Sequence, residues 1–204
     1  MKLRHLFLVV VAILTAAAIY GWTIISGGFS ARSMPSRVEV FVAKRLRSLA
    51  TPTRARDAKN PVPGSPEVLS AAKAHFADHC ASCHGNDGRG ATLIGRGLYP
   101  KPPDMTLQDT QNLTDGELYY IIENGIRFTG MPAFGEEEGN ESNEESWALV
   151  HFIRHLPSMT DDEAIEMKKM NPRSPAELAK EEERRKFLAG EDVEPVEGNH
   201  EHHH

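Results

Sequence analysis

The 204-residue sequence is poor in cysteine: Cys80 and Cys83 are its only two. A fold stapled by several disulfides needs a larger set of cysteines, so no disulfide framework is available to this chain. A structural zinc site would need two more Cys or His ligands at short spacing, and no further cysteine is present. The scarcity of cysteine therefore excludes a disulfide scaffold and argues against structural zinc.

Acidic residues are scarce in the first 60 positions, which hold ten Lys or Arg against two Asp or Glu. Residues 61–204 hold thirteen basic against twenty-seven acidic residues, so the net charge of −6 hides a basic part and an acidic part. A basic stretch beside an apolar one suits anionic lipid headgroups. The acidic remainder argues against nucleic-acid binding and favours partners with basic surfaces.

Charge is absent from Leu6 to Ile25, a run of twenty residues. At the helical rise of about 1.5 Å per residue, this run covers the roughly 30 Å hydrocarbon core of a bilayer. A cleavable signal peptide is the alternative, because Ala16–Ala18 offers small residues. The apolar run continues past them, and Tyr20 and Trp22 suit a membrane interface, so we predict an uncleaved transmembrane signal anchor over residues 1–30.

The two cysteines belong to Cys80-Ala81-Ser82-Cys83-His84, a C-x-x-C-H motif typical of c-type haem attachment. Thioether bonds from both cysteines fix the porphyrin to the chain, and the adjacent His84 can then place a ring nitrogen on the iron. A redox-active pair would use C-x-x-C alone and leave the histidine unexplained. We therefore predict one covalent haem c. Such haem is attached on the outer side of the bacterial cytoplasmic membrane, so we expect the bulk of the chain on that periplasmic side.

Residues 31–64 are expected to connect the anchor to the haem domain. An amphipathic basic helix is predicted over residues 35–50, with apolar positions at helical spacing: Val38, Phe41, Val42, Leu46 and Leu49. It could lie on the membrane surface, dock on a partner, or pack on the chain's own domain. Prolines and a glycine between residues 51 and 66 predict a linker.

The haem domain is predicted over residues 65–157. Its first helix opens at Ser65 with a cap and first-turn pattern and runs to His79, which delivers the motif at the helix end. Glycines and prolines over residues 91–110 predict an irregular loop, and a loop of that length in a compact domain is expected to cover something.

Two capping boxes predict the remaining helices of this domain. Thr114–Glu117 opens a helix that ends near Asn124. Ser142–Glu145 opens a helix rich in apolar residues that stops before Pro157.

Between these two helices lies Thr129–Gly135, which contains Met131. A methionine in a loop held by glycines and a proline is a candidate for the iron ligand opposite His84, although a core methionine is the commoner fate. Rivals for that role are Met105, Met159, His75, His79, His151 and His155. His75 and His79 lie on the helix that leads into the motif, from which their side chains could reach the face of the iron opposite His84 only with difficulty. His151 and His155 are four residues apart on a predicted helix, a spacing that suits a pair of metal ligands, a solvent-exposed helix face or a face packed in the core.

This order of helix, C-A-S-C-H, Gly/Pro-rich loop, helix, G-M-P-A-F loop and helix over residues 66–157 resembles a class I mono-haem cytochrome c. The resemblance implies an all-α fold in which the first and last helices cross, with the haem between loops. It implies that Cys80 and Cys83 bind the haem, that His84 is the proximal ligand and that Met131 is the distal ligand. One loop proline would orient the proximal histidine, and the candidates are Pro100, Pro102 and Pro103. Candidates for propionate contacts are Tyr99, Arg89 and Arg96.

The function expected from this resemblance is transfer of single electrons between respiratory partners by a membrane-tethered cytochrome. Two axial ligands leave no open site for a substrate, so we expect no enzyme activity in the chain itself, although it could be a subunit of a membrane oxidoreductase complex. The alternatives are a haem sensor or ligand-binding module in which Met131 is displaced, and a haem peroxidase. The acidic run Glu136–Glu138 could steer a basic partner or be a solvated loop.

The C-terminal part goes beyond the resemblance. Residues 158–190 are predicted as a charged helical extension, with a capping box at Thr160–Glu163 and a helix from Ser174 to near Gly190. Expected ion pairs on that helix are Glu181/Arg185 and Glu182/Lys186. The extension could be a docking arm or merely peripheral. Residues 191–204 form an acidic, His-rich tail that we expect to be disordered; it could bind a transition metal, be an affinity tag, or have no role.

Overall fold

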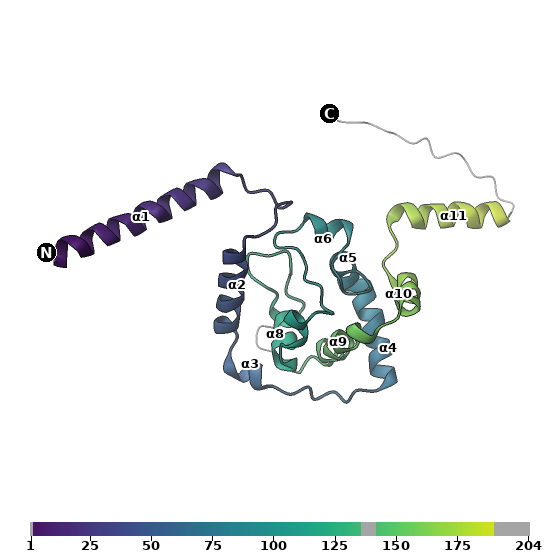
Figure 1. The fold of residues 1–204 in the computed structure, drawn as a ribbon. Helices are drawn as coiled ribbons and strands as arrows, with labels where there is room; N and C mark the ends of the chain where they lie inside the picture. The colour runs from purple at the N-terminus through teal and green to yellow at the C-terminus, as the bar shows by residue number, and fades with distance from the viewer. Residues whose placement is uncertain (1, 136–141, 190–204) are drawn as a thin grey trace.

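The computed structural model describes residues 2–135 and 142–189, and all regular elements in these residues are helical (Figure 1). This confirms the predicted all-α class. The acidic run Glu136–Glu138 and the His-rich tail of residues 191–204 lie outside the described residues.

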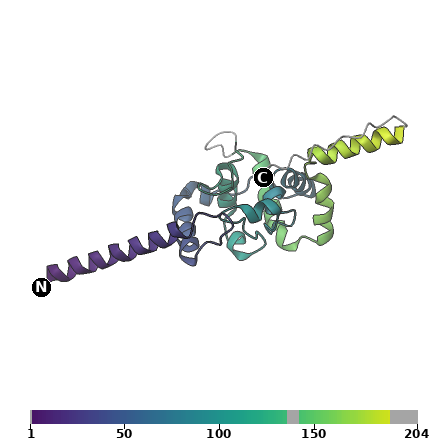
Figure 2. The ribbon, with the colours of Figure 1, turned by 90° about the horizontal axis from the view of Figure 1, so that it is seen from above.

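Helix α1 (Lys2–Ser26) extends away from the other helices in both views (Figures 1 and 2). None of its apolar span from Leu3 to Ser26 is buried against the protein. The span is long and apolar enough to cross a membrane, as predicted, although a signal sequence has the same length and composition.

Helix α2 (Arg37–Ala50) begins at a capping box, in which Ser36 and Glu39 each satisfy the other's backbone N–H. It lies against α7 (Gln108–Gln111) and the loop before it, because the Tyr99 hydroxyl donates to Glu39 at 2.9 Å and Lys44 pairs with Asp109 at 2.6 Å. The predicted helix over residues 35–50 is therefore present and is joined to the chain's own domain.

The segment expected to be a Pro-rich linker contains a short helix, α3 (Thr53–Asp57), and packs on the domain that follows it. The Thr114 hydroxyl donates to the Arg56 carbonyl at 2.7 Å, and the Asn60 amide donates to the Trp147 carbonyl at 2.9 Å. The His151 ring lies 2.7 Å from the Val62 carbonyl oxygen. These bonds hold the segment on the helices α8 (Asp115–Asn124) and α9 (Glu144–His155).

The core is formed by α4 (Pro66–His75), α8 (Asp115–Asn124) and α9 (Glu144–His155). The Phe76 and Phe152 rings pack 4.7 Å apart where the first helix meets the last, and Tyr119 stacks on Trp147 at 4.1 Å. The contact between first and last helices that the resemblance implied is therefore present.

Residues 91–110 are not wholly irregular, so that prediction is wrong in part. They contain α6 (Leu93–Gly97) and the first three residues of α7 (Gln108–Gln111), joined by an irregular stretch. Helix α6 forms because the Thr92 hydroxyl accepts from the Gly95 N–H at 2.8 Å, a cap that compensates for poor helix formers.

The capping box of α8 is confirmed, with Thr114 and Glu117 in their predicted roles. The one predicted for α9 is wrong by one residue, because Asn143 is the N-cap in place of Ser142. Its side-chain oxygen accepts from the N–H groups of Glu145 and Ser146 at 3.1 and 3.3 Å. Asn143 is favoured because its amide also donates to the Glu123 carboxylate at 2.9 Å. After α9, a 3-10 turn spans Leu156–Ser158.

The C-terminal extension begins with α10 (Asp161–Met167), whose predicted capping box is confirmed, followed by a 3-10 turn at Lys168–Met170. Met167 is only 1% exposed, so α10 packs on the core. Helix α11 (Pro175–Ala189) is exposed along its length, and its predicted end near Gly190 lies outside the described residues.

One of the two ion pairs predicted on α11 is present. Lys186 and Glu182 lie 3.3 Å apart. Glu181 pairs with Arg173, before the helix, in place of the predicted Arg185.

Glu163 joins three helices, because its carboxylate pairs with Lys73 of α4 and with His155 of α9 at 3.0 Å while capping α10. The hydrogen bond from Lys73 is the largest cause that lowers the Glu163 pKa to about 2. A pKa below its unfolded value means that the carboxylate stabilises the fold at neutral pH and loses this effect as the pH falls from about 4.5 towards 2.

We expect Glu163→Gln to lower the free energy of unfolding by roughly 1 kcal/mol at pH 7. The difference from wild type should shrink at pH 3. Urea unfolding of the full chain at pH 7 and pH 3 measures the difference in free energy of unfolding between the variant and the wild type. The control is Glu166→Gln, at an exposed position of the same helix. An equal difference at pH 7 and pH 3 would show that the ionised carboxylate is not the stabilising group.

Candidate functional site

The motif is delivered by continuous helical structure. Helix α4 passes into a π-helical turn over Phe76–Cys80, and α5 (Ala81–His84) completes the motif. Helical structure thus extends past the predicted end at His79. A π-helical turn changes the direction of the side chains that follow, and such turns are frequent at functional sites. It places both cysteines and His84 at the C-terminal end of the helix.

The chain after His84 turns back over the motif. The Gly90 N–H donates to the His84 carbonyl at 2.7 Å, and the Thr92 hydroxyl donates to the Cys83 carbonyl at 3.1 Å. Helix α6 then lies against α5, as Figure 1 shows. These bonds hold the helix end that carries the predicted site.

The half-buried His84 side chain lies beside the Phe76 ring. Its Nδ1 is buried and has no hydrogen-bond partner in the described residues, and its ring centroid lies 6.4 Å from that of Phe76. Burial lowers the pKa of His84, which favours the neutral ring at pH 7. Neutral imidazole is the form that binds metal, so the side chain suits the predicted ligand role.

Cys80 and Cys83 are both free thiols. Burial, and to a smaller extent the charge of Cys83, raises the pKa of Cys80 to about 12. Reactive C-x-x-C pairs instead have a cysteine with a lowered pKa, so this environment argues against the redox-pair interpretation. Two free thiols beside a neutral histidine with an unpaired ring nitrogen fit the residues that covalent haem attachment requires.

Met131 lies in a loop that is bonded at both ends. Within it, the Met131 N–H donates to the Thr129 hydroxyl and the Ile126 N–H donates to the Met131 carbonyl, both at 3.1 Å. Further on, the N–H groups of Phe134 and Gly135 donate to carbonyls at the end of α8, at 3.1 and 3.0 Å. The loop is therefore ordered and presents a half-buried Met131.

The two predicted ligand segments border the same stretch of chain, at the end of α6. A Cβ atom built on Gly95 would lie 2.6 Å from the Cys83 carbonyl oxygen. A Cβ atom built on Gly130 would lie 2.7 Å from the Leu98 side chain. Residues 95–98 thus contact the motif on one side and the neighbour of Met131 on the other.

The rival histidines are engaged elsewhere. Their partners are Glu145 for His75 at 3.4 Å, Asp78 for His79 at 3.2 Å, the Val62 carbonyl for His151 and Glu163 for His155. Met105 is 7% exposed in the core, and Met159 packs against the core. The described residues contain no group of three or more His, Cys, Asp or Glu side chains that could hold a metal ion. His151 and His155 of α9 are therefore not part of such a site.

The residues predicted to support the haem are placed as follows. Tyr99 donates to Glu39 of α2, and Arg96 donates to the Ala91 carbonyl at 2.8 Å, while Arg89 is exposed. Since Nδ1 of His84 has no acceptor in the part of the chain described, Pro100, Pro102 and Pro103 remain alternative predictions for its orienting partner.

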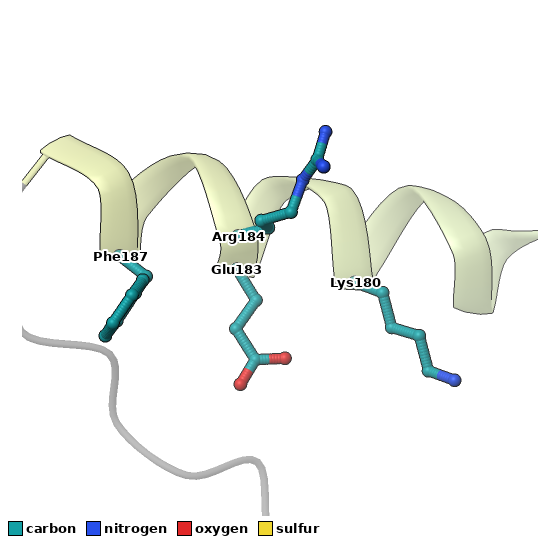
Figure 3. A pocket seen from close by; sticks show the side chains of 4 residues that line it. All are labelled: Lys180, Glu183, Arg184 and Phe187. Carbon is teal, nitrogen blue, oxygen red and sulfur yellow. The ribbon is translucent and has the colours of Figure 1, made fainter.

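A shallow hollow on α11 lies apart from these residues (Figure 3). It is lined by Lys180, Glu183, Arg184 and Phe187, all from one exposed helix, and Arg184 points away from the other three. Among the described residues, only this one helix lines the hollow, so we assign it no function.

We expect Gly95→Ala to lower the free energy of unfolding by about 1–3 kcal/mol, because the added methyl group meets two carbonyl oxygens, those of Cys83 and Gly90, at 2.6 Å. The matched control is Gly97→Ala in the same helix, where nothing lies within 4 Å and the change should stay within about 0.5 kcal/mol. Urea unfolding followed by circular dichroism measures both. Equal effects of the two changes would contradict the close packing of α6 on the motif.

Residues 67–153 match the family described as cytochrome c oxidase, cbb3-type, subunit III. A solved structure, the Kuenenia stuttgartiensis reducing HAO-like protein complex Kustc0457/Kustc0458, is 24% identical, with a TM-score of 0.41, over 48% of this chain and 49% of that one. The chain therefore spans about half the length of that relative. The search of curated proteins gives no match.

Proposed function

We propose that residues 67–153 form a c-type cytochrome domain and that the chain is a membrane-tethered mono-haem cytochrome that passes single electrons between respiratory partners. The observation that carries this proposal is the arrangement at the end of α5, where two free thiols adjoin a neutral His84 whose buried nitrogen has no partner.

Each residue of the proposed site has one role. Cys80 and Cys83 would hold the porphyrin by thioether bonds, and His84 and Met131 would be the two ligands of the iron. The bound haem c supplies a one-electron ferric/ferrous couple. The chain contributes a half-buried thioether on an ordered loop, and His/Met ligation raises the reduction potential relative to two histidines. With both axial positions filled, the chain itself offers no open site for a substrate.

Helix α1 is proposed to be the membrane anchor, with the haem domain on the periplasmic side of the bacterial cytoplasmic membrane. Anchoring confines the domain near membrane partners and raises their effective concentration. The description of the matching family, subunit III of a cbb3-type oxidase, supports a place in a multi-subunit respiratory complex. The electron donor and acceptor would then be redox proteins at the same membrane.

We expect Met131→Ala to abolish the weak far-red absorbance band of ferric iron bound to methionine and to lower the reduction potential, because a thioether ligand is lost. The matched control is Met159→Ala, which removes a half-buried methionine that packs against the core and should leave the band unchanged. Optical spectra and redox titration of the full chain measure both. A high-spin ferric iron in the wild type would instead support a sensor or a peroxidase with an open distal side.

We expect the double change Cys80→Ser with Cys83→Ser to yield protein from which acid and organic solvent extract all haem, because both thioether bonds are missing. Wild-type protein should keep its haem under the same treatment. The mass of the intact chain should exceed that of the polypeptide by one haem in the wild type only. Retention of haem by the double variant through denaturation would refute attachment at these cysteines.

A further inference from the structure

Helix α2 turns its apolar side away from the protein. The apolar residues of this stripe are exposed, from 45% at Val42 to 81% at Leu49, and no residue of the helix is buried. The stripe consists of Val38, Phe41, Val42, Leu46 and Leu49. Their separations of three and four residues place them on one face of a helix.

The opposite side of α2 faces the domain through polar contacts. Glu39 accepts from the Tyr99 hydroxyl at 2.9 Å, Lys44 pairs with Asp109 at 2.6 Å, and Val40 is half-buried on this side. A helix on a water-soluble domain normally buries its apolar stripe and exposes its polar face. The reversed orientation of α2 indicates that something apolar covers the stripe.

The position of α2 in the chain identifies what covers it. Only residues 27–36 separate the end of α1 from the start of α2, and ten residues span at most about 35 Å when fully extended. The connecting segment is also held to the domain, because the Lys101 ammonium donates to the Ala31 carbonyl at 3.2 Å. The apolar stripe therefore stays close to the point where α1 would leave a bilayer.

The charges around the stripe match an anionic lipid surface. Arg37 and Arg45 are exposed, and the Arg45 guanidinium lies 5.4 Å from the centre of the Phe41 ring. Long basic side chains beside exposed aromatic and aliphatic ones are typical of helices in the membrane interface, where the charged ends reach lipid phosphates.

We infer that α2 lies in the interface of the same anionic bilayer that α1 spans, with its apolar stripe at the acyl-chain boundary and Arg37 and Arg45 at the phosphates. This inference rests on the proposed membrane anchoring by α1. Because α2 is bonded to the loop beside α6, and the segment after α2 is bonded to α8 and α9, the bilayer then holds the haem domain in one orientation. The domain would not swing freely on a linker.

The test uses the full chain in vesicles of phosphatidylcholine and phosphatidylglycerol, with a nitroxide label on Val42→Cys. We expect the label to collide with dissolved oxygen, which concentrates in lipid, much more often than with a water-soluble nickel chelate. Labels on Leu14→Cys in α1 and on Ser158→Cys, an exposed residue of the domain, are the references for lipid and water. The parent chain without an added cysteine reports any label on Cys80 or Cys83.

Failure of this inference is distinguishable from failure of the proposed anchoring. A lipid signal at Leu14 with a water signal at Val42 would overturn the inference and leave the anchor standing. A water signal at Leu14 would overturn both. A label at Val42 that neither reagent reaches would mean that a protein surface covers the stripe, and it would also overturn the inference.

A second variant tests the stripe itself. Adding Phe41→Asp and Leu49→Asp to the labelled chain should remove the preference for oxygen at Val42, because two carboxylates oppose insertion beside anionic lipid. Both residues are exposed, so the fold should tolerate the changes. The matched control is Ile165→Asp on α10, 56% exposed, which should leave the signal at Val42 unchanged. An unchanged oxygen preference in the double variant would overturn the inference.

Discussion

The packing of Phe76 on Phe152 is the contact on which the rest of the site depends. It joins the first and last helices of the predicted haem domain at the point where α4 passes into the π-helical turn that leads to Cys80. The Phe76 ring is also the aromatic neighbour of His84. Replacing a buried phenylalanine by alanine typically lowers the free energy of unfolding by about 3–5 kcal/mol. The Phe76–Phe152 contact therefore stabilises the domain, and it also fixes the direction in which the motif leaves α4.

Segments outside the predicted haem domain reinforce this contact from both ends of the chain. The stretch after α2 is bonded to α8 and α9, and α10 reaches the core through Met167 and holds α4 to α9 through Glu163. Only α1 and α11 stand apart among the described helices (Figure 2). The extension is therefore two parts, a structural α10 and an exposed α11 that is available to a partner.

Much of this could be predicted where local chemistry decides the outcome. The caps at Ser65, Thr114 and Thr160 depend on residues three positions away, and all three are present. The structure differs from the predictions where contacts between residues far apart in the sequence decide the outcome. Asn143 displaces Ser142 as a cap because it also reaches Glu123, α6 forms against the motif, and the Pro-rich segment docks on helices far along the chain. Of the site, the helix end bearing Cys80, Cys83 and His84 was predictable, whereas ligation by Met131 stays a prediction because its loop is shaped by α8 and Leu98.

In the proposed function, His84 and Met131 would close both axial positions, so that the chain would carry electrons and bind no small molecule at the iron. Carbon monoxide tests this directly, because it binds ferrous haem only where an axial position is open or its ligand leaves easily. Adding it to the reduced full chain should leave the visible spectrum unchanged. Rapid formation of a carbon monoxide complex by all of the haem would contradict the account and identify a ligand-binding haem protein.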